Sequence, residues 1–150
     1  CREIGATTIG IANNPNTKLL EKSDIPILLS TPPEVIAGST RLGAGTAQKI
    51  ALNMMSSCMG IYLGNVMDGM MVNLIANNIK LFKRSEEIVM NITGCNRDQA
   101  AKSLQRSKGA VKLAVLLIEG AKTLSEAKQF LDQEMQNLRA AISALRAGKI

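Results

Sequence analysis

IPILLSTPPEVIAGSTRLGAGTAQK, residues 25–49, carries an apolar run into a long loop and then into a helix. The apolar run at 25–29 follows a second one, TTIGIA at 7–12, which ends in the turn signal of residues 13–15. Nearly continuous apolar strands are typical of a parallel sheet covered on both faces. A short helix over residues 17–21 is expected to link them, as in a βαβ unit. The sequence therefore predicts an α/β fold.

Two parallel strands are too few for a sheet that stands by itself, because both edges and both faces stay open. Further strands are therefore expected either upstream of residue 1 in the native polypeptide or in another chain. The chain begins with Cys1 rather than Met, in what reads as the approach to a strand. We therefore expect it to be a fragment of a longer polypeptide.

From Gly45 onward the apolar pattern is helical. The first helix is predicted to carry one apolar stripe, formed by Ala47, Ile50, Ala51, Met54, Met55, Cys58 and Ile61. A second helix is predicted to run from about Met67 to Ile92 and to end at Gly94. The methionines of both helices are interpreted as core residues, with an interface as the alternative. Either way, apolar area left exposed by an incomplete sheet is expected to drive self-association.

Three compact helices are predicted over residues 96–135. Asn96 with Gln99, and Thr123 with Glu126, have the spacing of capping boxes at helix starts. The middle helix is predicted to lie between two glycines, at 109 and 120, and the apolar stripe of the third helix continues to Leu145. Residues 1–64 and 65–150 are accordingly predicted to be an α/β part and a helical part.

Composition excludes several classes of function. Histidine and tryptophan are absent and aromatic residues make up 2% of the chain, which excludes histidine chemistry and argues against base-stacking nucleic-acid modules. The net charge of +6 comes mainly from residues 65–150, spread one or two residues at a time, which favours a solvated face over a polyanion patch. No run of 18 uncharged apolar residues occurs. We therefore expect no nucleic-acid partner and no membrane span.

The loop after the second strand is the candidate site, because ligands of open α/β sheets bind beyond the carboxyl ends of strands. Ser39 and Thr40 offer hydroxyl groups, and Arg41 offers a fork of donors for an anion. Glu34 offers a carboxylate that takes a proton or accepts a hydrogen bond from a hydroxyl-rich ligand. The N-terminus of the following helix adds free N–H groups and its positive dipole end. These four residues are predicted to bind a sugar phosphate or a similar anion.

Each of these residues also has a purely structural interpretation. Ser39 or Thr40 can serve only to cap the helix, and Arg41 only to pair with a surface carboxylate. Glu34 can be a solvated loop residue, and the glycines of the loop can serve tight turns alone. Neither the phosphate-loop pattern nor the dinucleotide-binding glycine pattern occurs here.

The segment PPEVIAGSTRLGAGTAQKIALNMMSS, residues 32–57, resembles the signature segment of N-acetylmuramic acid 6-phosphate etherases. The resemblance continues through residues 64–120, which begin GNVMDGMMVNLIANN. This family shares the sugar isomerase (SIS) fold with the glucokinase regulatory proteins. One departure is Gly43, where the family usually has Lys.

The resemblance implies an enzyme that cleaves the lactyl ether of N-acetylmuramic acid 6-phosphate to N-acetylglucosamine 6-phosphate and D-lactate. A carboxylate removes the C2 proton, lactate leaves from C3, and water adds to the unsaturated sugar, with no metal or cofactor. The family serves recycling of cell-wall sugars in the bacterial cytoplasm, as a homodimer. An alternative of another class is a sugar-phosphate sensor of the glucokinase-regulator type that binds without turnover. A third, weaker one is a basic helical interaction module.

The resemblance also implies what this chain lacks. The two catalytic glutamates of the family and its Ser/Thr-rich phosphate loop map to no position here, so the catalytic residues are expected upstream of residue 1. The chain alone is then expected to be inactive. Glu34, Ser39, Thr40 and Arg41 are expected to line the substrate pocket. Residues 96–135 resemble a small three-helix module of ubiquitin-associated (UBA) type, after the C-terminal part of the SIS domain.

Overall fold

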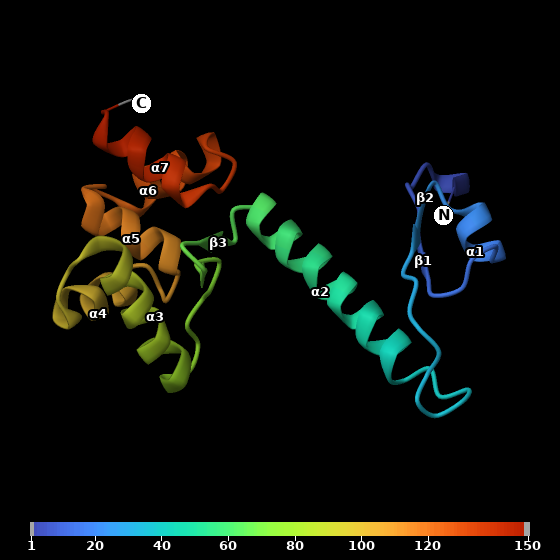
Figure 1. Ribbon diagram of the computed structural model, residues 1–150. Coiled ribbons are helices and arrows are strands. Elements are labelled where there is room, and N and C mark those ends of the chain that lie inside the picture. The colour runs from blue at the N-terminus through green and yellow to red at the C-terminus, as the bar shows by residue number, and fades with distance from the viewer. Residues whose placement is uncertain (1, 149–150) are drawn as a thin grey trace. The chain divides into compact units, whose positions relative to one another are not determined.

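A computed structural model describes residues 2–148 of the chain (Figure 1). The chain divides into two compact units, residues 1–57 and 58–150. This division falls inside one long helix, α2 (Gly43–Tyr62), so that helix contributes residues to both units. The predicted boundary after residue 64 stays a prediction.

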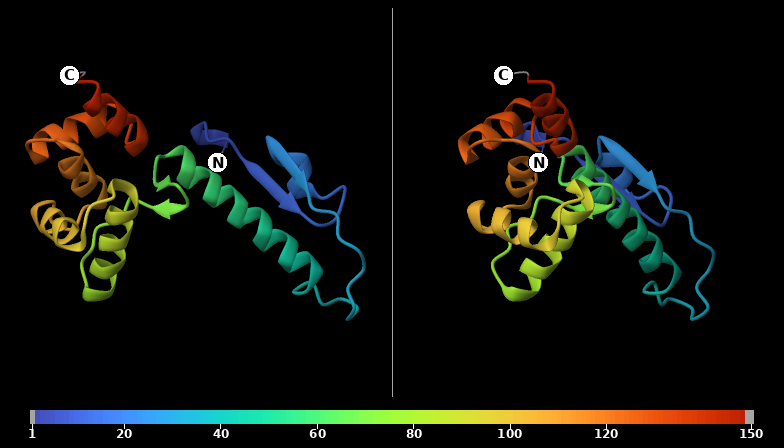
Figure 2. Two further views of the ribbon diagram at one scale, coloured as in Figure 1. Left: turned by 60° about the vertical axis from the view of Figure 1, so that its left-hand side comes forward. Right: turned by 90° about the vertical axis from the view of Figure 1, so that its left-hand side faces the viewer.

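The first unit is built around a parallel pair of strands, as the apolar runs predict. A short 3-10 helix, η1 (Arg2–Ile4), precedes β1 (Ile9–Ala12) and β2 (Ile25–Leu28), which pair in parallel with Ile9 opposite Ile25. Between the strands lies α1 (Lys18–Lys22), which packs against both (Figure 2). The α/β class and the βαβ arrangement are therefore confirmed.

A glycine in β1 allows α1 to pack closely on the strand. A Cβ atom built at Gly10 would lie 2.0 Å from the Oγ of Ser23 and 3.0 Å from the backbone oxygen of Leu19. The hydroxyl of Ser23 itself donates to that oxygen at 2.6 Å. At the start of α1, the hydroxyl of Thr17 accepts from the N–H of Leu20, which is N-cap geometry. Small and capping residues thus fix the crossover at both ends.

Helix α2 begins two residues before its predicted start at Gly45, and its apolar stripe is exposed. Of its residues only Ala44 is buried, whereas Ile50 and Met54 are 54% and 63% exposed. The thiol-bearing Cys58 on the same stripe is also exposed. The interpretation of Met54 and Met55 as core residues is therefore wrong for the chain as described.

The predicted helix from Met67 to Ile92 is only half correct. Its first part is a hairpin of β3 (Val66–Met67) and β4 (Met70–Met71), joined at Asp68–Gly69. Both turn residues have positive φ, 50° and 73°, as the type I′ hairpin turn requires. An Asp-Gly pair between apolar residues is the sequence signal for such a turn, and the 3.6-residue spacing of the apolar side chains obscured it.

The second unit contains five helices of the described chain. Asn78 and Gly94 bound the first of them, as N-cap and left-handed C-cap, and Gly94 is the predicted end. The capping box of Asn96 and Gln99 is confirmed in both directions. The five helices are α3 (Ile79–Thr93), α4 (Arg97–Arg106), α5 (Val111–Glu119), α6 (Leu124–Gln133) and α7 (Leu138–Arg146).

The apolar stripe that was predicted to continue from the third helix of residues 96–135 to Leu145 is divided between two helices. Met135 and Gln136 have φ values of 48° and 66°, which end α6, and the side chain of Asn137 accepts from the N–H of Ala140 to begin α7. The hydrophobic periodicity is continuous across this break because both helices pack on the same core. The apolar stripe alone therefore does not locate the break.

All five helices share one hydrophobic core. Its largest fully buried side chains are those of Phe130, Leu104, Leu116 and Leu138. Helix α5 contacts α3, α4, α6 and α7, so it lies at the centre of the unit (Figures 1 and 2). Residues 96–135 therefore do not have a core of their own, because α3 and α7 complete it.

Candidate functional site

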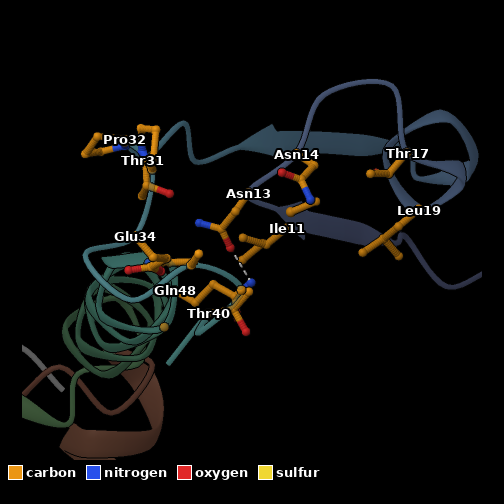
Figure 3. A pocket seen from close by; sticks show the side chains of 16 residues that line it. Ile11, Asn13, Asn14, Thr17, Leu19, Thr31, Pro32, Glu34, Thr40 and Gln48 are labelled. Carbon is orange, nitrogen blue, oxygen red and sulfur yellow. Dashed lines mark hydrogen bonds between the residues drawn. The ribbon is translucent and has the colours of Figure 1, made fainter. Parts of the chain in front are cut away.

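The first unit contains a cleft at the carboxyl ends of its two strands. It has a volume of about 860 Å³ and is bounded by the ends of β1 and β2, the loop after β2 and the start of α2 (Figure 3). This is the position at which open α/β sheets bind ligands. The cleft therefore coincides with the loop that the sequence singled out. Its lining side chains include Asn13, Asn14, Thr17, Thr31, Glu34, Thr40 and Gln48.

Glu34 lines the cleft and caps α2 from a distance of nine residues. Its Oε1 accepts from the N–H of Ala44 at 3.0 Å, and its Oε2 from the N–H of Gly43 at 2.8 Å. These two bonds, first that of Ala44 and then that of Gly43, lower the pKa of the Glu34 carboxyl, because they stabilise its charged form. Glu34 is thus a solvent-accessible carboxylate that two N–H groups of α2 hold in place.

The N-terminus of α2 is consequently occupied by groups of the chain itself. Beyond the two N–H groups held by Glu34, the N–H of Gly45 donates to the backbone oxygen of Thr40 at 2.8 Å. The expected free N–H groups are therefore not found at these three residues. What the helix presents to the cleft is an ordered carboxylate, and each of its oxygens keeps a further lone pair for a ligand hydroxyl.

The other three predicted residues differ in whether they line the cleft. Thr40 lines the cleft, whereas Ser39 and Arg41 are not among its lining residues. The backbone N–H of Ser39 donates to the oxygen of Ile36 at 3.0 Å, which folds the loop back on itself. Arg41 is exposed and forms no ion pair within residues 2–148. The structure thus places Glu34 and Thr40 in the same cleft, and leaves Arg41 exposed outside the cleft lining.

Two amide side chains in the cleft were not predicted. Asn13, just after β1, donates from Nδ2 to the backbone oxygen of Leu29 at 3.0 Å. Its Oδ1 accepts from Nε2 of Gln48, on α2, at 2.6 Å (Figure 3). The sequence signal was present, because a polar residue directly after an apolar strand faces the same sheet edge, but Asn13 was interpreted only as part of a turn.

Gly43, the position of the departure from the family pattern, lies directly beside Glu34. A Cβ atom at this position would lie 3.4 Å from Oε2 of Glu34, which is ordinary van der Waals contact. The backbone at Gly43 needs no left-handed conformation. A lysine would therefore fit here, and its side chain would start next to the carboxylate.

Two further kinds of feature are absent from residues 2–148. No group of three or more cysteine, aspartate or glutamate side chains converges there in a way that would hold a metal ion. None of the helices in this range combines the length and apolar character that a bilayer crossing needs.

Comparison with known proteins gives matches along nearly the whole chain. It is 45% identical over 131 residues to an N-acetylmuramic acid 6-phosphate etherase of Deinococcus radiodurans, 87% of this chain and 43% of that protein. It is 41% identical over 147 residues to an N-acetylmuramic acid 6-phosphate etherase 2 of Bacillus licheniformis, 98% of this chain and 49% of that protein. A relative of the same name from Clostridium botulinum is 40% identical over 142 residues.

The chain spans about half the length of the curated relatives that it matches, 43–49% of each. No family model matches the chain. The similarity therefore includes both the cleft and the helical unit, but less than half of each relative.

Proposed function

The chain belongs to the family of N-acetylmuramic acid 6-phosphate etherases, and from that premise we propose that it is the C-terminal half of such an enzyme. The parent enzyme would cleave the D-lactyl ether of N-acetylmuramic acid 6-phosphate to N-acetylglucosamine 6-phosphate and D-lactate, by elimination and addition of water. It would act in peptidoglycan recycling in the cytoplasm. The similarity along 87–98% of the chain is the observation that carries the proposal.

The cleft supports this proposal by its position and its groups. A sugar phosphate needs hydrogen-bond partners for its hydroxyls and a cation for the phosphate. Glu34 and Thr40 line the cleft, and Ser39 and Arg41, which lie on the same loop outside that lining, are proposed to complete the pocket. Glu34 is held by two N–H groups of α2, so it would bind sugar hydroxyls as a charged acceptor and not act as the base. The acid–base groups of the reaction are proposed to belong to the other half of the parent enzyme.

The finer assignment of the fold is part of the same proposal. The parallel pair β1–β2 with its cleft is assigned to the last part of a SIS-type sheet, and residues 96–135 to a UBA-like module that α3 and α7 complete. The parent is proposed to be a homodimer. The exposed apolar stripe of α2 supports this, because such area on a stable protein is usually covered.

The proposed function is tested by measuring D-lactate release from N-acetylmuramic acid 6-phosphate. The full-length polypeptide that carries this segment is expected to release lactate and N-acetylglucosamine 6-phosphate in equal amounts, whereas the isolated 150 residues are expected to release none. Turnover by the isolated chain would show that its own groups do the chemistry. Saturable binding without product by the full-length polypeptide would instead indicate the sensor, which the names of the relatives do not favour.

A further inference from the structure

The two amides in the cleft form a connected chain with only one possible orientation. The backbone oxygen of Leu29 only accepts hydrogen bonds, so the nitrogen of the Asn13 amide must face it. The oxygen of Asn13 then faces Gln48, which in turn must present its nitrogen. Gln48 is therefore held with its carbonyl oxygen, Oε1, pointing away from Asn13.

This orientation gives Gln48 a defined chemical preference. Its Oε1 forms no hydrogen bond within residues 2–148, and the side chain lines the cleft between Asn13 and Thr40 (Figure 3). A fixed carbonyl oxygen accepts from O–H or N–H groups and repels anions. Glu34, the one charged side chain among the described residues that line the cleft, has the same preference. This part of the cleft therefore suits the neutral, donor-rich face of a ligand.

We propose that Gln48 is a specificity-determining residue that accepts a hydrogen bond from a ring hydroxyl or the acetamido N–H of the bound sugar, and that Asn13 is the positioning residue that fixes it. This inference rests on the proposed function. In this proposal two different sets of side chains bind the two parts of the ligand. Arg41, which lies outside the cleft lining, binds the phosphate, and the Asn13–Gln48 pair determines which sugar is bound. Asn13 acts only through Gln48 and does not touch the ligand.

The test uses the full-length polypeptide, with N-acetylglucosamine 6-phosphate and inorganic phosphate as probes in titration calorimetry. Gln48→Met keeps the shape of the side chain and removes its hydrogen bonds. It is expected to weaken sugar-phosphate binding roughly fivefold to tenfold, as for one neutral hydrogen bond, and to leave phosphate binding unchanged. Asn53→Met is the matched control, because Asn53 lies on the same helix outside the cleft and should change neither affinity.

Asn13 is tested through its coupling to Gln48. Asn13→Leu is expected to weaken sugar-phosphate binding, but the double variant Asn13→Leu with Gln48→Met should bind no more weakly than Gln48→Met alone. Additive losses would overturn the positioning role. Amide hydrogen exchange at β1 and α2 checks that each variant is folded.

The outcomes separate this inference from the proposed function. If the unmodified polypeptide releases lactate but Gln48→Met binds the sugar phosphate as tightly as before, the role of Gln48 is wrong and the proposed function stands. Equal weakening for both probes would also overturn it, since Gln48 would then support the phosphate. If the unmodified polypeptide neither releases lactate nor binds the sugar phosphate, the proposed function fails first.

Discussion

Glu34 shows how one carboxylate can define both a helix start and a cleft. Residue 42 is a leucine, so α2 has no side chain at its own boundary that could cap it, and the cap comes from nine residues upstream. Two N–H bonds to one carboxylate resemble the way helices bind anions. The helix thus holds an anion of its own chain, which lies at the edge of the cleft.

The variant Glu34→Gln tests this cap, because it removes the titratable carboxylate and with it the expected dependence on pH. Because the folded state lowers the pKa of Glu34 below 4.5, the charged carboxylate stabilises the fold at higher pH. That contribution is fully present above pH 4.5 and is lost as the pH falls through the lowered pKa. In the native chain, the amide shifts of Gly43 and Ala44 should therefore titrate together below pH 4.5, measured by NMR.

The glutamine variant should show no such titration and a weaker acid dependence of its melting temperature. The proposed role of Glu34 as the cap would be excluded if both amides kept their acid titration after the substitution.

Ser85 is a second residue whose contribution to stability can be predicted, because its buried hydroxyl lacks a hydrogen-bond partner among the described residues. Its hydroxyl is fully buried in α3 and has no hydrogen-bond partner within residues 2–148. Folding therefore removes this hydroxyl from water without a compensating hydrogen bond, which destabilises the folded state. Ser85→Ala should therefore raise the free energy of unfolding by about 1 kcal/mol. Ser103→Ala is the matched control, since its buried hydroxyl donates to the oxygen of Ala114 at 2.8 Å and its loss should cost about 1 kcal/mol.

Chemical denaturation of both variants gives the two values, and the opposite signs are the prediction. A loss of stability in Ser85→Ala would mean that the hydroxyl has a partner in the folded protein.

At the scale of elements, the hairpin region is held to the helices by a close backbone approach. Gly64 has φ of 67°, and a Cβ atom there would lie 2.6 Å from the backbone oxygen of Gln136, in the turn between α6 and α7. The same turn oxygen accepts from Nζ of the buried Lys112 at 2.8 Å. The α6–α7 turn thus joins the start of the hairpin region to helix α5.

Gly64→Ala and Gly69→Ala distinguish two costs of replacing a glycine of positive φ, which are the backbone strain and the steric clash of the new Cβ atom. Both positions have positive φ, but nothing lies within 4 Å of a Cβ atom at Gly69. Gly69→Ala should cost about 1 kcal/mol of unfolding free energy from backbone strain alone. Gly64→Ala should cost clearly more, on the order of 3 kcal/mol, because the backbone at Gln136 must move.

Urea unfolding curves give the comparison. Equal costs for the two variants would contradict the close approach at Gln136.

Elements whose local signal agrees with the hydrophobic periodicity were predicted from the sequence, and elements whose local signal lies inside a continuous helical pattern were missed. The capping box at Asn96 and the left-handed end at Gly94 were correct because each needs only a few neighbouring residues. The hairpin at Asp68–Gly69 and the break at Met135–Gln136 were missed, since apolar side chains recur at helical spacing on both sides. The cap by Glu34 and the Asn13–Gln48 bond join distant residues, so no local pattern indicated them.

At the scale of the whole molecule, the exposed stripe of α2 predicts assembly. Ile50 and Met54 lie one turn apart on this stripe and are more than half exposed. In the isolated chain the stripe should drive self-association. The double variant Ile50→Lys with Met54→Lys should raise the dissociation constant at least about tenfold, because two charges would have to be desolvated.

Sedimentation velocity at micromolar concentration measures this effect. Ser56→Lys adds a charge on the opposite face of the same helix and should leave the association unchanged. A native chain that sediments as a monomer would refute the prediction.

The exposed thiol on this stripe allows the burial of the stripe to be followed by the rate of a chemical modification. Cys58 is exposed, whereas Cys95 is half-buried in the helical unit. An alkylating reagent should therefore modify Cys58 faster than Cys95 when the stripe is bare, and modify Cys58 more slowly when a neighbouring chain shields it. Mass-spectrometric timing of that single adduct at rising protein concentration would follow the covering of α2 without any engineered label.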